Sequence, residues 1–314
     1  MIDVLTFGEA MVALRADRPL RTSGSLRMSV AGAEANVSIG LSRLGHRTQW
    51  VGLTGDDELG AMVMRTLRAE GVGLTHAQRG EGPTGLVIFE PRVADVTRVS
   101  YYRTGSAGSR LEPGQVRTAL RQPIKVIHTT GITAALGAEP LAAVRTAVGA
   151  ASKLGALMCL DVNYRSKLWD RDAAAAALRP LMGGVDILVA SDDELALAAP
   201  PGARSEAEQV KALLEAGVRE VVVKRGAAGA EVFEESGSTR RPALTVPVKD
   251  TVGAGDAFVA GYLSALIDGE PISARLERAV TAGAFAVAST GDWEGLPYRD
   301  ELDLLRAAPG STIR

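Results

Sequence analysis

A glycine turn followed by an aspartate is the strongest chemical signal in this 314-residue chain. Gly253, Ala254, Gly255 and Asp256 open a stretch whose apolar residues have helical spacing. Such a turn can point free backbone N–H groups and the positive end of the helix dipole at one anion. An aspartate in the first turn is expected to stay ionised and can accept a proton from a hydroxyl beside a bound phosphate. The pattern predicts phosphoryl transfer, although a capped helix of purely structural origin has the same features.

Two other phosphate-binding patterns are excluded. Residues 55–62 have the glycine spacing of a Walker A loop but lack its Lys-Ser/Thr pair. Residues 253–261 do not match the Gly-x-Gly-x-x-Gly fingerprint of dinucleotide-binding folds. The sequence therefore gives no support to NAD-dependent chemistry.

The elements that must position this turn follow an alternating pattern. Short apolar runs alternate with longer amphipathic segments, as in the βαβ units of a mostly parallel sheet. We predict strands at 4–7, 48–53, 125–129, 156–161, 186–190 and 220–224. We predict helices at 33–44, 57–70, 140–153, 173–182, 205–216 and 255–267. Ligands of such α/β folds bind at the carboxyl ends of the parallel strands.

Two segments, at about 11–30 and 85–103, break this rhythm. Their apolar and polar residues alternate with a period of two and no helix lies between, which predicts antiparallel strands. A small β-sheet built from two separate segments would suit a lid over the ligand-binding edge. We therefore expect one domain over 1–314 that carries this lid. The exposed edges of the lid strands favour a homodimer or higher oligomer that assembles through the lid.

Composition and charge limit the partners and the compartment. The formal net charge is −2 and the basic residues are dispersed, which argues against nucleic acid as a partner. No apolar run approaches the ~20 residues of a membrane span, and the N-terminus lacks the basic region of a signal peptide. Cys159, the only cysteine, lies in an apolar run and predicts a buried thiol in a reducing cytoplasm. The spacing of His46, His76 and His128 does not suggest a metal site.

The 250–262 segment resembles the C-terminal signature of the ribokinase-like (PfkB) carbohydrate kinases. Residues 31–36 with 42–45 resemble the N-terminal signature of that family, and 224–229 resembles its nucleotide loop. The resemblance spans nearly the whole chain. It implies a three-layer α/β/α sandwich with a mostly parallel central sheet, a small β-sheet lid, and ATP-dependent phosphorylation that requires Mg²⁺.

The resemblance also implies roles for individual residues. Asp256 would be the catalytic base, and Gly253, Ala254 and Gly255 would form the anion hole for the transferred phosphoryl group. Glu194 would order Mg²⁺ through water, although Ser191 replaces the asparagine of the family and leaves the metal shell open. The implied sugar-binding residues are Gly32, Ala33, Asn36, Tyr101, Arg103, Arg165, Asp256 and Asp292. The implied nucleotide-binding residues are Asn163, Arg165, Ser191, Lys224, Gly226, Gly229, Gly253 and Gly255.

Two arginines point to the class of sugar. Arg103 follows a predicted lid strand and Arg165 follows a core strand, and a guanidinium binds a carboxylate with two parallel hydrogen bonds. The carboxylate of a sugar acid would need such a partner. If the two arginines are instead ordinary surface residues, they give no information about the substrate. Both segments, and residues 291–295, resemble those of 2-keto-3-deoxygluconate kinases, although Val87 stands where many of these carry tyrosine.

The resemblance thus implies phosphorylation of 2-keto-3-deoxygluconate to its 6-phosphate. The galactonate epimer, a neutral sugar such as fructose or ribose, and a non-catalytic sugar-binding regulator remain open.

Overall fold

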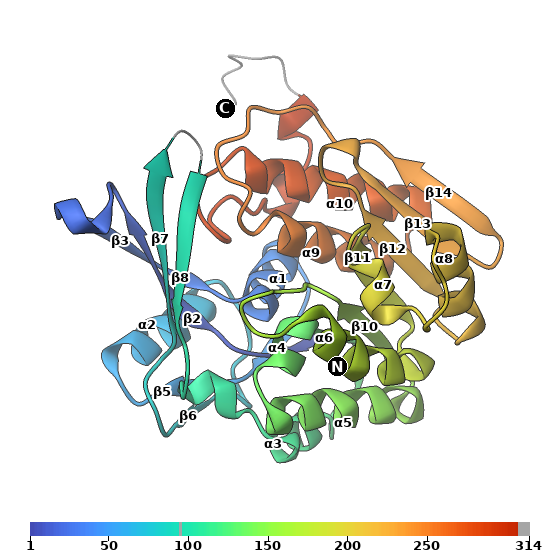
Figure 1. The fold of residues 1–314 in the computed structure, drawn as a ribbon, viewed down its shortest axis with the longest axis horizontal. Coiled ribbons are helices and arrows are strands. Elements are labelled where there is room, and N and C mark those ends of the chain that lie inside the picture. Colours follow the sequence, from blue (N-terminus) through green and yellow to red (C-terminus); the bar gives the residue numbers. More distant parts are fainter. Residues whose placement is uncertain (94–95, 307–314) are drawn as a thin grey trace.

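An eight-stranded sheet forms the centre of the computed structural model, which describes residues 1–93 and 96–306 (Figure 1). The strands lie in the order β14-β13-β12-β11-β10-β9-β1-β4. Every pairing from β4 to β12 is parallel, and β13 and β14 are antiparallel additions. The strands of this central sheet are β1 (Ile2–Phe7), β4 (Thr48–Val51), β9 (Ile124–Thr130), β10 (Leu157–Asp161), β11 (Ile187–Ser191), β12 (Glu220–Lys224), β13 (Ala230–Glu234) and β14 (Gly237–Arg241).

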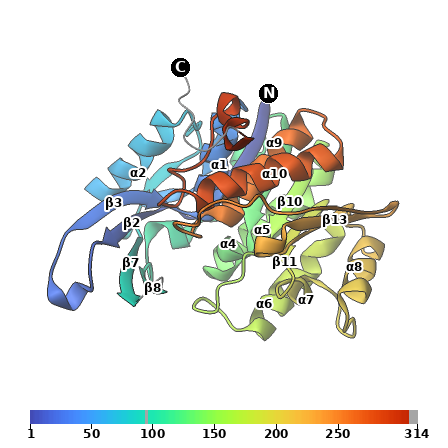
Figure 2. The same ribbon diagram turned by 90° about the horizontal axis from the view of Figure 1, so that it is seen from above.

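Helices cover both faces of the central sheet, which makes three layers (Figure 2). One face packs on α1 (Ala33–Arg43), α9 (Ala254–Ile267) and α10 (Ile272–Val287). The other packs on α3 (Pro113–Ala119), α5 (Ala138–Leu154), α6 (Arg171–Leu178), α7 (Leu195–Ala198) and α8 (Glu206–Glu215). The central strands are runs of buried aliphatic residues because each has an apolar layer on both sides. The predicted three-layer α/β/α architecture with a mostly parallel central sheet is confirmed.

The two segments that break the βα rhythm form a separate sheet, which stands beside the central one (Figure 1). We call it the small sheet; its strands are β3 (Leu26–Ala31), β2 (Met11–Ala16), β7 (Leu86–Val93) and β8 (Val96–Tyr102), in that order. The expectation of purely antiparallel pairing is wrong, because β2 and β7 run parallel where the two segments meet. One face packs on α2 (Glu58–Ala69) and the other faces the candidate site. Residues 94–95 of the second segment lie outside the described residues.

Several predicted boundaries are wrong for local reasons. The predicted strand 48–53 is two strands, because the chain leaves β4 at Gly52 and continues as β5 (Leu53–Gly55), which pairs with β6 (Gln78–Gly80). The predicted helix 173–182 ends at Leu178, where a 3₁₀ turn begins because Pro180 has no N–H to continue the helical ladder. Helix α10 and the β13–β14 hairpin were not predicted, and α4 (Gly131–Ala135) is a single short turn after β9.

Two expectations from composition can be compared with the structure. Cys159 is a fully buried free thiol on β10, as predicted. Within residues 1–93 and 96–306, none of the helices is both long enough and apolar enough to cross a bilayer.

Candidate active site

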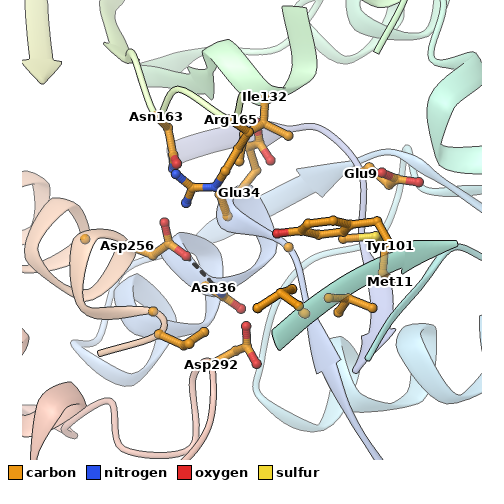
Figure 3. A pocket seen from close by; sticks show the side chains of 18 of the residues that line it. Glu9, Met11, Glu34, Asn36, Tyr101, Ile132, Asn163, Arg165, Asp256 and Asp292 are labelled. Atoms are coloured by element: carbon orange, nitrogen blue, oxygen red, sulfur yellow. Dashed lines mark hydrogen bonds between the residues drawn. The ribbon is translucent and has the colours of Figure 1, made fainter. Parts of the chain in front are cut away.

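A cavity of about 390 Å³ opens at the carboxyl ends of the parallel strands, between the central sheet and the small sheet (Figure 3). Its walls come from the strand ends of β10, β11 and β12, the first turns of α1 and α9, and the inner face of the small sheet. Fourteen of the predicted site residues line it: Gly32, Ala33, Asn36, Tyr101, Arg103, Asn163, Arg165, Ser191, Glu194, Lys224, Gly253, Gly255, Asp256 and Asp292. Ala254, Gly226 and Gly229 are not among its lining residues.

Asp256 lies in the first turn of α9, directly after the glycine turn. Gly253 precedes the helix with φ +76°, and a Cβ at this position would overlap the backbone oxygen of Asp292. Only glycine tolerates both constraints. Burial raises the pKa of Asp256 to about 7, although the 2.7 Å hydrogen bond from Asn36 Nδ2 to Asp256 Oδ2 favours the ionised form. The sequence predicts an aspartate that stays ionised. With a pKa of about 7, Asp256 instead titrates near neutrality.

Lys224 ends β12 beside the glycine turn. Its Nζ donates to both carboxylate oxygens of Asp161, each at 2.9 Å, and a Cβ built on Gly255 would lie 3.7 Å from this nitrogen. Burial opposes the charge of Lys224, but the nearby carboxylates, Asp161 first among them, outweigh it and raise its pKa. An ammonium group is thus held at the same helix start as the glycine turn, in which the predicted donor Ala254 N already donates to Thr251 O at 3.4 Å. The turn at Gly226–Ala228 follows immediately, with Gly226 and Gly229 at positive φ.

A carboxylate that could hold Mg²⁺ through water lies just after the end of β11. Glu194 accepts hydrogen bonds from the backbone N–H of Tyr164 at 2.7 Å and of Ser191 at 2.9 Å, which fixes its orientation toward the cavity. Among the described residues there is no group of three or more acidic, His or Cys side chains that could form a complete cage. Mg²⁺ is usually held by one or two carboxylates with water and substrate phosphates, so the donor set fits an ion that arrives with a nucleotide.

The two arginines differ in their availability. Arg165 is exposed on the loop after β10, where Asn163 adopts a left-handed φ of +39°, and it points into the cavity (Figure 3). Arg103 is buried and forms an ion pair with Glu9, which also accepts a hydrogen bond from Ser106 Oγ. A buried guanidinium needs a charged partner. Arg103 therefore lines the cavity with its charge already paired, and its predicted contact with a substrate carboxylate stays a prediction.

Asp292 also has a partner that the sequence did not suggest. Its Oδ2 accepts a 2.8 Å hydrogen bond from Nη2 of Arg15 on β2. Burial raises the pKa of Asp292 to about 6, although the charge of Arg15 opposes this. Asp292 thus lines the cavity as one half of an ion pair rather than as a free carboxylate.

Four charged residues in or beside the cavity were not among the predicted site residues: Glu9 and Glu34 line it, and Arg15 and Asp161 pair with residues that do. Glu34, in the first turn of α1, is buried at the cavity wall and accepts three hydrogen bonds, from Thr130 N, Thr130 Oγ1 and Thr133 Oγ1. Burial raises its pKa. The sequence did contain a signal for two of them. Glu34 is a charged residue in an alanine-rich helix start, and Asp161 is a charged residue at the end of an apolar strand.

The comparisons with known proteins agree with this geometry. Residues 1–299 match the family model described as pfkB family carbohydrate kinase. A 2-dehydro-3-deoxygluconokinase from Thermoproteus tenax is 39% identical over 316 residues, covering 98% of this chain and 95% of the relative. A 2-dehydro-3-deoxygalactonokinase from Haloferax volcanii is 31% identical over 295 residues, covering 92% of each protein.

A solved structure has the same fold. It is described as a putative ribokinase II from E. coli in complex with ATP and Mg²⁺, and it superposes with a TM-score of 0.88 at 23% identity. The match covers 98% of this chain and 99% of the solved one. The family match over residues 1–299 and the 39% identity to the Thermoproteus tenax kinase place the chain in the pfkB family of carbohydrate kinases.

Proposed function

We propose that the protein transfers the γ-phosphoryl group of ATP to a primary hydroxyl of a keto-deoxy sugar acid, 2-keto-3-deoxygluconate first, giving the 6-phosphate. The observation that carries the proposal is the meeting of Asp256 with the Gly253–Gly255 turn and Lys224 in one cavity. The relatives named above phosphorylate sugar acids by name, and the E. coli structure of the same fold contains ATP and Mg²⁺ by its description.

Asp256 is the base in this proposal. A pKa of about 7 lets the carboxylate be ionised at neutral pH and still hold a proton as the new bond forms, which is the useful range for a general base. The N–H groups at the start of α9 and the ammonium of Lys224 stabilise the charge on the transferred group. Mg²⁺ would neutralise phosphate charge, with Glu194 holding its water shell and Ser191 N fixing Glu194.

The sugar acid is recognised mainly through Arg165. Its guanidinium forms no ion pair among the described residues, although its charge opposes the burial that raises the pKa of Asp256, whereas Arg103 is paired with Glu9. A cavity of about 390 Å³ lies at the small end of ligand pockets, as suits a six-carbon acid. The small sheet acts as the lid, and its apolar inner face excludes water from the transfer.

A coupled ADP-release assay tests this proposal with 2-keto-3-deoxygluconate, its galactonate epimer, fructose and ribose as acceptors. We expect the highest kcat/KM for a keto-deoxy acid, and ³¹P NMR of the product should show a phosphate ester of the primary hydroxyl. The two epimers are measured separately because the two relatives are named for different ones. A higher kcat/KM for a neutral sugar would overturn the sugar-acid assignment. ATP binding without turnover on any acceptor would favour the non-catalytic regulator.

The small sheet also supports a proposal about assembly. Its edge strands β3 and β8 carry four exposed apolar residues, Leu26, Met28, Val96 and Tyr102. We propose that two chains pair through this sheet in the cytoplasm. Sedimentation should show a dimer that Met28→Glu converts to monomer. A wild-type monomer at micromolar concentration would contradict the pairing.

A further inference from the structure

Arg15 connects the small sheet to the opposite wall of the cavity. It lies on β2, and its Nη1 donates to Asp250 Oδ2 while its Nη2 donates to Asp292 Oδ2, both at 2.8 Å. Asp250 and Asp292 belong to two different loops of the main body, one before α9 and the other after α10. A single guanidinium therefore joins three separate segments of the chain.

The surroundings of Arg15 hold its side chain in this position. Its guanidinium carbon lies 4.2 Å from the centre of the Phe89 ring, and Phe89 is its register partner on β7. The side chain is only 15% exposed. The planar guanidinium is stacked on the ring, and each of its terminal nitrogens donates to a different carboxylate. It therefore fixes the positions of both acids. Lysine, with a single ammonium, cannot reproduce this arrangement.

Both acids in turn hold the glycine turn. Asp250 Oδ1 accepts a 3.1 Å hydrogen bond from Val252 N, and Asp250 Oδ2 accepts one of 3.3 Å from Gly291 N. The backbone oxygen of Asp292 lies against Gly253, in the space that a Cβ would occupy. Displacement of either acid would therefore move the backbone of the 250–255 turn.

Two neighbouring carboxylates at an anion site are unfavourable without a cation between them. Burial is the main cause that raises the pKa of Asp292, the charge of Arg15 lowers this pKa, and the charges of Glu294 and Asp250 add to the rise. Unpaired, the two acids would repel each other and would also oppose a bound phosphate. The guanidinium cancels this repulsion without itself lining the cavity.

We propose that Arg15 is a positioning residue that couples closure of the small sheet to the order of the 250–255 phosphate-binding turn. The inference rests on the proposed kinase function, and it assigns to the lid a second task besides covering the substrate. When the small sheet is in place, Arg15 completes the turn; when the sheet moves away, Asp250 and Asp292 lose their common partner. Phosphoryl transfer is then favoured only in the closed state.

The first experiment compares Arg15→Met and Arg15→Lys with a control, Arg27→Met. Arg27 is the register partner of Arg15 on β3 and is exposed. Methionine keeps an apolar stem over Phe89 and removes the fork. We expect kcat to fall by about 10- to 100-fold in Arg15→Met, with KM for the sugar acid changed by less than about 3-fold, because the geometry of transfer is lost rather than sugar binding. Lysine should restore little, and Arg27→Met should behave as wild type.

A charge-rescue experiment separates positioning from a general effect on folding. Asp292→Asn removes one of the two carboxylates that Arg15 neutralises. The loss of kcat caused by Arg15→Met should therefore be several-fold smaller in the Asp292→Asn background. Equal losses in both backgrounds, or an unchanged kcat in a folded Arg15→Met protein, would overturn the inference.

Hydrogen exchange gives a readout that does not depend on turnover. In Arg15→Met, amides of residues 250–256 should exchange faster than in wild type and Arg27→Met, because the turn has lost its support. Unchanged exchange in this segment would contradict the inference even if kcat fell. If the wild-type protein phosphorylated none of the acceptors, the proposed function would fail, and the exchange experiment would still decide the role of Arg15.

Discussion

The side-chain amide of Asn36 donates a 2.7 Å hydrogen bond to Oδ2 of Asp256, which joins the first turns of α1 and α9 at the cavity (Figure 3). The two residues are 220 positions apart in the sequence. The bond occupies one oxygen of the carboxylate, and Oδ1 accepts no hydrogen bond from the described residues. The remaining oxygen is thus the one available to a substrate hydroxyl.

Asp256→Asn should abolish most of the turnover while leaving the fold and nucleotide binding intact. The amide keeps the shape of the side chain but cannot take a proton, so we expect kcat to fall on the order of 10²-fold or more. Isothermal titration with a non-hydrolysable ATP analogue should give an affinity close to that of wild type. Asp56→Asn, at an exposed carboxylate, is the control. Near-normal turnover in Asp256→Asn would remove Asp256 from the role of base.

The activity should depend on pH through the same carboxylate. Because burial raises the pKa of Asp256 to about 7, the base is ionised above this pH and protonated below it. We expect kcat/KM to fall about tenfold per pH unit on the acid side of pH 7. The hydrogen bond from Asn36 favours the ionised form, so Asn36→Ala should move this limb to higher pH. A limb that stays in place would show that another group controls the profile.

The same shift predicts a cost in stability. The folded pKa of about 7 exceeds the ordinary aspartate value of 3.8, so the folded state holds the proton more tightly than the unfolded chain. The free energy of unfolding should therefore decrease as pH rises from about 4 to about 7. Asp256→Asn carries no such charge and should be more stable than wild type at pH 8, with the difference shrinking toward pH 4. Urea unfolding at both pH values measures this, and a difference independent of pH would contradict it.

How far the sequence predicts this site depends on what each residue type requires. The glycine turn and Asp256 were predictable because local backbone geometry and a helix dipole act within a few residues. The small sheet was predictable from its period-two alternation. The partners of Arg103 and Arg15 were not, because Glu9 lies 94 residues before Arg103 and Asp292 lies 277 residues after Arg15, and only the fold brings them together. The pKa of Asp256 depends on burial, which a single sequence does not give.

Gly253→Ala should disrupt the phosphate-binding turn. The residue has φ +76°, and its new Cβ would overlap the backbone oxygen of Asp292, so the backbone must shift. We expect kcat to fall on the order of 10²-fold, since displaced N–H donors no longer face the transferred group. Gly149→Ala, in α5 with open space around its Cβ, is the matched control. Equal activities of the two variants would show that this turn does not contribute donors.

Arg165 and Arg103 should respond differently to substitution, because Arg103 forms an ion pair with Glu9 and Arg165 forms no ion pair among the described residues. Arg165→Ala should raise KM for the sugar acid by about 10- to 100-fold, the value of a charged hydrogen-bonded contact, with little change for a neutral sugar. The control Arg145→Ala, at an exposed position on α5, should change neither KM.

Arg103→Ala should instead lower the free energy of unfolding by about 3–5 kcal/mol, because it leaves the carboxylate of Glu9 buried without its cation. If KM for the sugar acid rose only in Arg103→Ala, the carboxylate would bind at Arg103, and Glu9 would have to release that arginine when substrate enters.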